Sequence, residues 1–145
     1  MKAVVQRVHS AQVEVNQKVV GKIGQGYLIY ICFELGDTKQ NMEKLIKKIL
    51  NLRVFEDENE KMNLSLSDVS GQILSVSQFT LSWDGKKGHR PSFDKSMPPN
   101  EAKVMYKFFN DELKKAGIQL EMGRFGAQMN VSSINDGPVT FFLDY

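Results

Sequence analysis

Residues 27–33 read YLIYICF, seven consecutive apolar residues without a charge. A strand buried on one face alternates apolar and polar side chains, whereas a strand buried on both faces does not. We therefore interpret residues 27–33 as the central strand of a sheet. The preceding GKIGQG (residues 21–26) indicates a hairpin turn rather than a phosphate loop, because it lacks the Lys-Ser/Thr pair and leads into a strand.

The sequence on either side of this strand predicts a mixture of strands and helices. Upstream, residues 2–8 and 11–15 are rich in valine and predict two strands. Downstream, the apolar residues recur at the spacing of one helix face, with Asp37 or Thr38 as the cap. They are Met42, Leu45, Ile46, Ile49 and Leu50.

The rest of the chain continues this pattern. A second helix is expected from Pro99, a favourable first-turn residue, to Gly117, a C-cap. The further expected elements are strands at 52–55, 72–81, 118–122, 128–133 and 139–143, with a polar loop at 56–63. This order predicts an α/β fold in a single domain spanning residues 1–145, with a mixed β-sheet or partly closed barrel flanked by two main helices.

Composition excludes several classes of protein. The 145 residues carry 19 Lys+Arg and 17 Asp+Glu, so a net charge of +2 gives no overall field for polyanions. No apolar run is long enough to cross a bilayer, and the start lacks the apolar core of a signal peptide. The only cysteine, Cys32, is expected to be a buried, inert thiol. We therefore expect a cytoplasmic protein without membrane contact.

Few residues are available for metal or nucleophilic chemistry. His9, His89 and Cys32 are the only soft ligands and lack metal-site spacing, so we expect no metal and no cofactor. A Ser-His-Asp triad would need one of the two histidines as its base, and nothing marks either for that role. An enzyme with this sequence would therefore use hydroxyls, amides, backbone groups or a group of its substrate.

The segment SQFTL (residues 77–81) changes character toward its end, and this change has two interpretations. Alternation puts Gln78 and Thr80 on one face of the expected strand, and Ser77 and Phe79 on the other. Both faces thus change from apolar to polar toward the end of the strand. A strand end that opens into a pocket explains this change, as does a strand that runs out to the surface.

Two further segments have both a structural and a functional interpretation. NDGPVT (residues 135–140) has the composition of a turn, and a functional interpretation requires a cis bond between Gly137 and Pro138. The loop DGKKGHRPSF (residues 84–93) is either a solvated loop or a phosphate-contacting one. In the second case its cations would be Lys86, Lys87 and Arg90.

Together these segments resemble the D-aminoacyl-tRNA deacylase family, also called D-tyrosyl-tRNA deacylases. The resemblance runs nearly end to end, and SQFTL with NDGPVT is its most specific pair. The other matching motifs are MKAVVQRV, GKIGQG, LRVFEDENEKMNLSL, KKGHRPSF and GRFGAQMNV. YICFEL (residues 30–35) departs from the family, which has a glycine near Cys32–Phe33. We expect this departure to lie away from the motifs.

The resemblance implies a homodimer that hydrolyses the ester between a D-amino acid and the 3′-terminal adenosine of tRNA. It implies a cis Gly137–Pro138 bond that reaches into the other subunit's site. Residues of SQFTL would line that site, with Gln78, Phe79 and Thr80 as catalytic candidates and Ser77 as a substrate contact. Phe125 and Met129 would flank the adenosine.

The implied activity suits a sequence without a side-chain base. Backbone carbonyls of Gly137 and Pro138 would hold the substrate ammonium, and an L side chain would clash with them, whereas glycyl-tRNA would be accepted. Backbone N–H groups near Phe79 and Thr80 would stabilise the oxyanion, with the substrate 2′-OH taking part. The Thr80 hydroxyl is the competing nucleophile, although no base adjoins it in sequence.

Two other functions remain open at the level of sequence. One is a non-catalytic tRNA-binding module on the same fold, which would lack turnover and chiral preference. The other is a hydrolase of a small ester or amide, which would act without tRNA.

Overall fold

One long strand organises the sheet. The first half of β1 (Lys2–Val15) pairs antiparallel with β3 (Gly26–Cys32), and its second half pairs with β2 (Lys18–Ile23). β8 (Asn130–Asp144) pairs antiparallel with β1 along nearly its whole length. The two strands expected at 2–8 and 11–15 are therefore one continuous strand, because the ladder with β8 spans both.

Parallel pairs extend the sheet on its other side. β6 (Gln72–Ser77) lies parallel to β3, and β7 (Gln119–Met122) lies parallel to β6. Gly26 permits the close approach at the start of β3, because a Cβ there would lie 1.9 Å from the carbonyl oxygen of Gln72. The order β2-β1-β3-β6-β7, with β8 on β1, makes a mixed and nearly closed, barrel-like sheet, as predicted.

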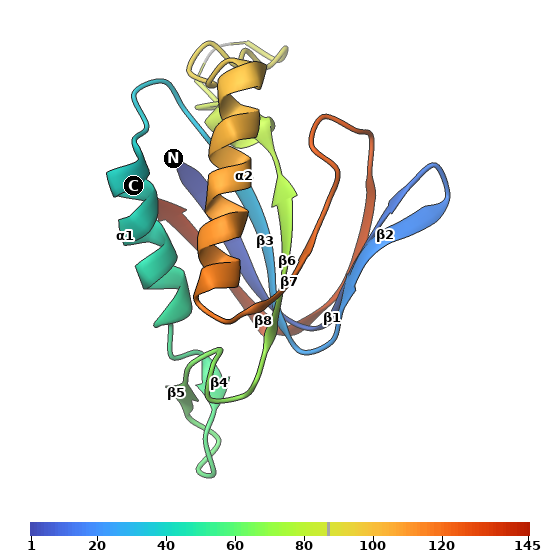
Figure 1. Ribbon diagram of the computed structural model, residues 1–145, viewed down its shortest axis with the longest axis vertical. Coiled ribbons are helices and arrows are strands. Elements are labelled where there is room, and N and C mark those ends of the chain that lie inside the picture. Colours follow the sequence, from blue (N-terminus) through green and yellow to red (C-terminus); the bar gives the residue numbers. More distant parts are fainter. Residues whose placement is uncertain (87) are drawn as a thin grey trace.

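Two helices cover one face of this sheet, as the computed structural model shows for residues 1–86 and 88–145 (Figure 1). α1 (Lys39–Leu50) begins at Thr38, whose side chain accepts a hydrogen bond from the Asn41 N–H. α2 (Pro99–Lys115) begins with proline in its first turn. Both helices were predicted, because their capping and apolar spacing are local properties of the sequence.

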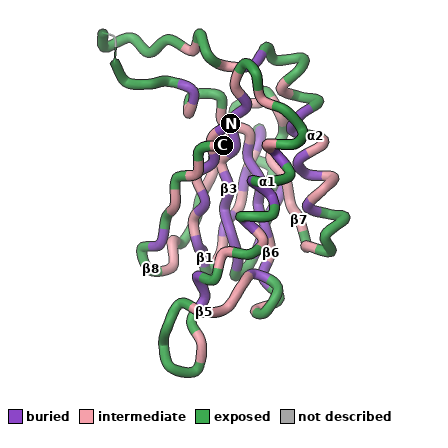
Figure 2. The backbone as a smooth tube through the Cα atoms, turned by 90° about the vertical axis from the view of Figure 1, so that its left-hand side faces the viewer, coloured by how far each residue is buried: buried purple, intermediate pink, exposed green. Residues whose placement is uncertain are grey.

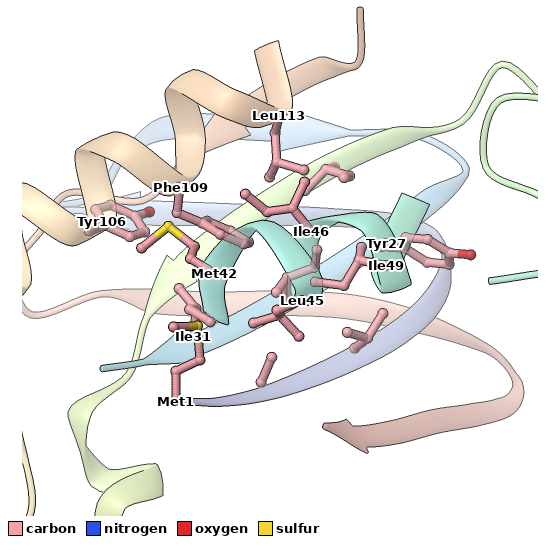
Figure 3. Close-up of a cluster of buried hydrophobic side chains, with 14 of the residues drawn as sticks. Met1, Tyr27, Ile31, Met42, Leu45, Ile46, Ile49, Tyr106, Phe109 and Leu113 are labelled. Atoms are coloured by element: carbon pink, nitrogen blue, oxygen red, sulfur yellow. The ribbon is translucent and has the colours of Figure 1, made fainter. Parts of the chain in front are cut away.

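The main core fills the space between the helices and the sheet (Figure 3). α1 contributes Leu45 and Ile49, α2 contributes Phe109 and Leu113, and β3 contributes Ile31. Burying an aliphatic or aromatic side chain of this size stabilises the fold by about 1.5–3 kcal/mol. The central strands β3 and β6 are accordingly buried, while the loops at both ends of the molecule are exposed (Figure 2).

A second core lies on the opposite face of β3 and β6. Leu28 and Leu74 pack there against Val13 of β1 and Val131 of β8. This arrangement confirms that residues 27–33 are apolar because both faces of the strand are covered.

Three further expected elements differ from the structure. The short strands β4 (Phe55–Glu56) and β5 (Met62–Leu64) form a hairpin in place of a strand at 52–55 and a loop at 56–63. The strand expected at 72–81 ends at Ser77, and a 3-10 turn, η1 (Phe79–Ser82), follows.

No helix in the described part of the chain is long and apolar enough to cross a membrane.

Candidate functional site

A cavity of about 640 Å³ lies where the parallel strands β3 and β6 end. Ligands commonly bind beyond the carboxyl ends of parallel strands, where connecting segments diverge. The start of α2 and the loop before β8 form the opposite walls. The lining residues are Cys32, Phe33, Val76, Ser77, Gln78, Phe79, Phe93, Ser96, Met97, Pro98, Pro99, Ala102, Phe125, Gly126, Ala127, Met129 and Val131.

The chemistry of this lining is mostly apolar. Among the lining residues, all of which belong to the described part of the chain, none is charged and none is a histidine. Polar side chains come from Ser77, Gln78 and Ser96. Apart from the Cys32 thiol, acid-base chemistry in the cavity is left to backbone groups, bound water or the substrate itself.

The predicted SQFTL motif forms the turn beside the cavity. The Gln78 N–H donates to the Ile31 carbonyl at 2.8 Å, which ties the start of the turn to β3. Ser77, Gln78 and Phe79 line the cavity, whereas Thr80 is not among its lining residues and is exposed. The apolar-to-polar change in the sequence thus marks both a pocket and the end of the strand.

The Thr80 hydroxyl accepts a hydrogen bond from Gln78 Nε2 at 2.6 Å. A nucleophilic hydroxyl needs a neighbouring group that accepts its proton. The contact with Gln78 instead brings a donor to the oxygen. This geometry favours a positioning function for Thr80 over attack by its hydroxyl.

Cys32 also belongs to the cavity, contrary to our expectation that YICFEL lies away from the motifs. The carboxyl end of β3 meets the turn after β6, so pairing between strands brings Cys32 to Phe79. The Cys32 thiol donates to the Phe79 carbonyl at 3.5 Å. Burial raises the pKa of this thiol to about 11, so it stays protonated at neutral pH.

Aromatic residues form much of the cavity wall. Phe125, predicted to flank an adenosine, packs against Tyr106 of α2 with ring centroids 5.9 Å apart. Phe93, which the sequence did not single out, meets the exposed Phe79 edge to face at 4.9 Å. Met129 lies in the wall as well. These flat and polarizable surfaces are suited to stacking with a base.

The second predicted motif, NDGPVT, is a bulge within β8 and not a turn between two strands. Val8 pairs with Asn135 and Gln6 pairs with Thr140, so Arg7 alone stands opposite residues 136–139. The ladder with β1 on either side holds these residues within one strand, which composition does not reveal. The Gly137–Pro138 peptide bond is cis, as the resemblance implies.

Arg7 and Asn135 hold the bulge in place. The Arg7 side chain is 4% exposed and donates through Nε to the Asp136 carbonyl at 3.2 Å and through Nη1 to the Val54 carbonyl at 2.6 Å. Its Nε also lies 3.1 Å from Asp136 Oδ2. Asn135 Nδ2 donates to the Arg7 carbonyl at 2.8 Å and to the Val139 carbonyl at 3.2 Å. The bulge is therefore a fixed element.

The two motifs do not meet within one chain. Ser77 pairs with Ile31, Ile31 pairs with Ala3, and Ala3 pairs with Leu143. At about 4.8 Å per strand, these three steps separate the SQFTL turn from the Leu143 end of β8 by roughly 14 Å along the sheet, and the bulge lies farther along β8. Gly137 and Pro138 accordingly do not line the cavity.

The remaining predicted residues lie in exposed segments. Lys86 and Arg90 are exposed in the loop before α2, and Lys87 lies outside the described residues. His9 lies beside the bulge, with Nε2 3.4 Å from Asp136 Oδ1, and does not line the cavity. His89 is exposed in the loop and does not line the cavity either.

Arg7 holds the bulge, although none of the sequence motifs pointed to this residue. In KAVVQRV it occupies the same alternating, inward position as Ala3 and Val5, which are fully buried. A charged residue at a buried strand position requires a partner. That pattern was the signal that could have found it.

Comparisons with known proteins agree over almost the whole chain. The family model described as D-Tyr-tRNA(Tyr) deacylase matches residues 4–144. A D-aminoacyl-tRNA deacylase from Thermodesulfovibrio yellowstonii is 51% identical over 99% of both chains. One from Geotalea daltonii is 52% identical over 99% of this chain and 96% of its own.

Two solved structures share the fold. One, titled "c-Myc DNA Unwinding Element Binding Protein", is 43% identical, with a TM-score of 0.95 over 100% of this chain and 99% of its own. The other is titled as a probable eukaryotic D-amino acid tRNA deacylase. It is 20% identical, with a TM-score of 0.86 over 99% of this chain and 98% of its own, and supports the fold alone.

Proposed function

The chain belongs to the D-Tyr-tRNA(Tyr) deacylase family and hydrolyses the ester bond of D-aminoacyl-tRNA, and we propose that a homodimer performs this reaction with each cavity completed by the partner's Gly-Pro bulge. The observation that carries the proposal is the separation of the two motifs. The cavity holds the SQFTL turn but not Gly137 or Pro138.

An apolar stripe on the sheet supports the homodimer. Val4 pairs with Tyr30 on one side and with Phe142 on the other, and the Phe142 residue is 59% exposed. These three residues lie on the face turned away from the helices, because the alternate residues Ala3 and Val5 belong to the helix-covered core. Phe142 is exposed beside the half-buried Val4 and Tyr30, and apolar residues grouped in this way are characteristic of protein interfaces.

Hydrolysis in this cavity would depend on backbone groups. Water adds to the ester carbonyl, negative charge develops on its oxygen, and the 3′-oxygen of the ribose leaves with a proton. The N–H groups of Phe79 and Thr80 begin a 3-10 turn and have no partner within it, so they are suited to stabilise that oxygen. The adjacent ribose 2′-OH is the group that would orient the attacking water.

The Thr80 hydroxyl as nucleophile is the competing mechanism. Replacing Thr80 by alanine removes that hydroxyl, so near-wild-type kcat in Thr80→Ala eliminates the nucleophile mechanism. The contact with Gln78 leads us to expect a loss of less than about tenfold, as for a positioning group. A loss of several orders of magnitude in Thr80→Ala, with recovery in Thr80→Ser, would establish Thr80 as the nucleophile.

Chiral selection would come from backbone atoms near the substrate Cα. Carbonyls of Gly137 and Pro138 from the partner subunit would accept hydrogen bonds from the substrate ammonium. A D side chain would point away, whereas an L side chain would clash with the backbone. Because glycine has no side chain, glycyl-tRNA would be hydrolysed too.

The terminal adenosine and the tRNA backbone would have separate contacts. Phe125 and Met129 in the cavity wall would flank the base. The exposed cations Lys86 and Arg90, together with Lys87, would contact phosphates. Since aminoacyl-tRNA is used by ribosomes, we also propose a cytoplasmic location.

The first experiment compares D-tyrosyl-tRNA, L-tyrosyl-tRNA and glycyl-tRNA at substoichiometric enzyme, with a D-tyrosine alkyl ester as a tRNA-free control. We expect multiple turnovers on the D and glycyl esters and an intact L ester. Equal rates on D and L esters would contradict chiral selection. Turnover of the alkyl ester alone would indicate a small-ester hydrolase, and binding without turnover a non-catalytic tRNA-binding module.

A complementation experiment tests the shared site. Ala127→Trp fills the cavity of one subunit, and Gly137→Ala disturbs the bulge of the other. A mixed dimer then contains one intact site, built from the normal cavity and the normal bulge. Random mixing should restore roughly a quarter of the wild-type sites. No recovery, despite mixed dimers detected by mass spectrometry, would exclude the shared site.

A further inference from the structure

The Phe79 carbonyl in the SQFTL turn is held by two side chains. The Cys32 thiol, at the end of β3, donates to it at 3.5 Å and lies 3.7 Å from the Phe33 carbonyl, the more distant of its two acceptors. The Ser82 hydroxyl donates to it at 2.8 Å from the end of the turn. Cys32 is 1% exposed and Ser82 is 2% exposed, so water does not compete freely with either contact. The carbonyl therefore has a fixed, inward direction.

The direction of this carbonyl also sets the direction of the Thr80 N–H. Both belong to one planar peptide unit, which is trans, so they point in opposite directions. With the Phe79 carbonyl directed at Cys32 and Ser82, the Thr80 N–H is directed away from them. A rotation of this peptide that re-aims the N–H would break both hydrogen bonds.

We propose that Cys32 and Ser82 are positioning residues for the deacylation reaction, which fix the orientation of the Phe79–Thr80 peptide, and with it the Thr80 N–H, by holding the Phe79 carbonyl. This inference rests on the proposed catalytic function of the turn. Donation to the carbonyl also polarises the peptide unit and makes its N–H a stronger donor. Transition-state stabilisation depends on such fixed dipoles, which need no reorganisation during the reaction.

The state of the thiol is consistent with this function. Burial, reinforced by the Glu34 carboxylate, raises the pKa of Cys32 above its usual value, while the ammonium groups of Lys2 and the chain start oppose the shift. At neutral pH the sulfur therefore carries the proton that it donates. A thiolate would repel the Phe79 carbonyl and lose the contact.

Variants that separate donation from space filling provide the test. Cys32→Ala and Ser82→Ala each remove one donor, while Cys32→Ser and Ser82→Thr each keep one. We expect kcat on D-tyrosyl-tRNA to fall about three- to tenfold in each alanine variant and about 100-fold in the double variant, with KM within twofold of wild type. Loss of a whole oxyanion donor costs about 10²–10³ in kcat, which bounds the effect.

Two controls distinguish positioning from general loosening of the fold. Ile49→Val trims the helix-covered core in α1, away from the cavity, and we expect wild-type kcat and KM. The Thr80 amide resonance in a ¹⁵N–¹H spectrum should move in the alanine variants and stay near its wild-type position in Cys32→Ser and Ser82→Thr.

The outcomes separate this inference from the function on which it rests. Wild-type kcat in the double alanine variant would overturn the positioning inference. The inference would also fail if the donor-keeping variants Cys32→Ser and Ser82→Thr lost as much kcat as the corresponding alanine variants. Wild-type protein that fails to deacylate D-tyrosyl-tRNA would instead overturn the proposed function. A loss confined to kcat, with recovery in the donor-keeping variants, supports positioning.

Discussion

The turn at residues 78–82 and the bulge at residues 136–139 differ in how the fold holds them. The turn lies over the end of β3 and beside the cavity, and contacts from Ile31 and Cys32 hold it. The bulge lies on β8, whose only strand partner in the described residues is β1, and Arg7 holds it. The turn therefore belongs to the cavity of its own chain, whereas the bulge is held rigidly but lies outside that cavity. A prearranged element without a local site is suited to act on a second subunit.

Gly137→Ala should produce the largest change and should act only on the bulge. Gly137 has φ of +138°, which side-chain-bearing residues rarely adopt, and a Cβ there would lie 2.6 Å from the Val139 nitrogen. We expect at least roughly a 100-fold loss of kcat/KM on D-tyrosyl-tRNA, comparable to removal of one oriented catalytic contact.

Gly117→Ala is the matched control for backbone strain. Gly117 has φ of +80° after α2, with open space around the added Cβ. It should cost about 1–2 kcal/mol of stability and leave deacylation unchanged. Full activity with intact rejection of the L ester in Gly137→Ala would show that the bulge does not act in the reaction.

Arg7→Lys tests whether the bulge must be held rigidly. Lysine keeps the positive charge but cannot reach both Asp136 and the Val54 carbonyl as the guanidinium does. We expect the free energy of unfolding to fall by about 1–3 kcal/mol, as for unsatisfied buried polar groups, and kcat/KM to fall about tenfold. Urea unfolding and deacylation assays measure the two effects.

The exposed ion pair between Lys107 and Asp111 on α2 provides the control for Arg7→Lys. Lys107→Ala should change stability by no more than about 0.5 kcal/mol. If Arg7→Lys also left stability and activity unchanged, the buried contacts of Arg7 would have no function in holding the bulge.

Neutralising the loop before α2 should have a moderate effect and should act on binding alone. If Lys86 and Arg90 each contact a phosphate, their double alanine variant should flatten the dependence of log K on log salt by about 1.4–1.8. Filter binding of tRNA between low and moderate salt measures this slope. The same substitutions at the exposed residues Lys44 and Lys48 of α1 are the control, and an equal change in both pairs would exclude a specific phosphate-contacting loop.

Alkaline pH should have the smallest effect, a loss of stability that arises from the Cys32 thiol in the cavity wall. The pKa of Cys32 is raised from 9.0 to about 11, so the folded state favours the protonated thiol. Its stabilising contribution is complete below pH 9 and is lost as the pH rises through 11. Urea unfolding at pH 7, 9 and 10 should show a smaller decline in Cys32→Ser than in wild type. Equal declines would mean that the thiol is not shielded from water.

The sequence predicted the elements that depend on neighbouring residues. The central strand, expected at 27–33 and found at Gly26–Cys32, follows from apolar spacing, as do the Thr38 cap of α1 and the proline start of α2 from backbone preference. The resemblance likewise depends on contiguous motifs, and the comparisons confirmed the family.

Only the tertiary structure decided how the motifs are arranged. The ladder between β1 and β8 makes residues 135–140, which have the composition of a turn, part of a bulge, and the pairing of β3 with β6 brings Cys32 into contact with Phe79. Arg7 lies about 130 residues from Asp136 in sequence, yet its guanidinium holds that residue. Strand pairing acts between residues that are distant along the chain, so local spacing carries no record of which residues will meet.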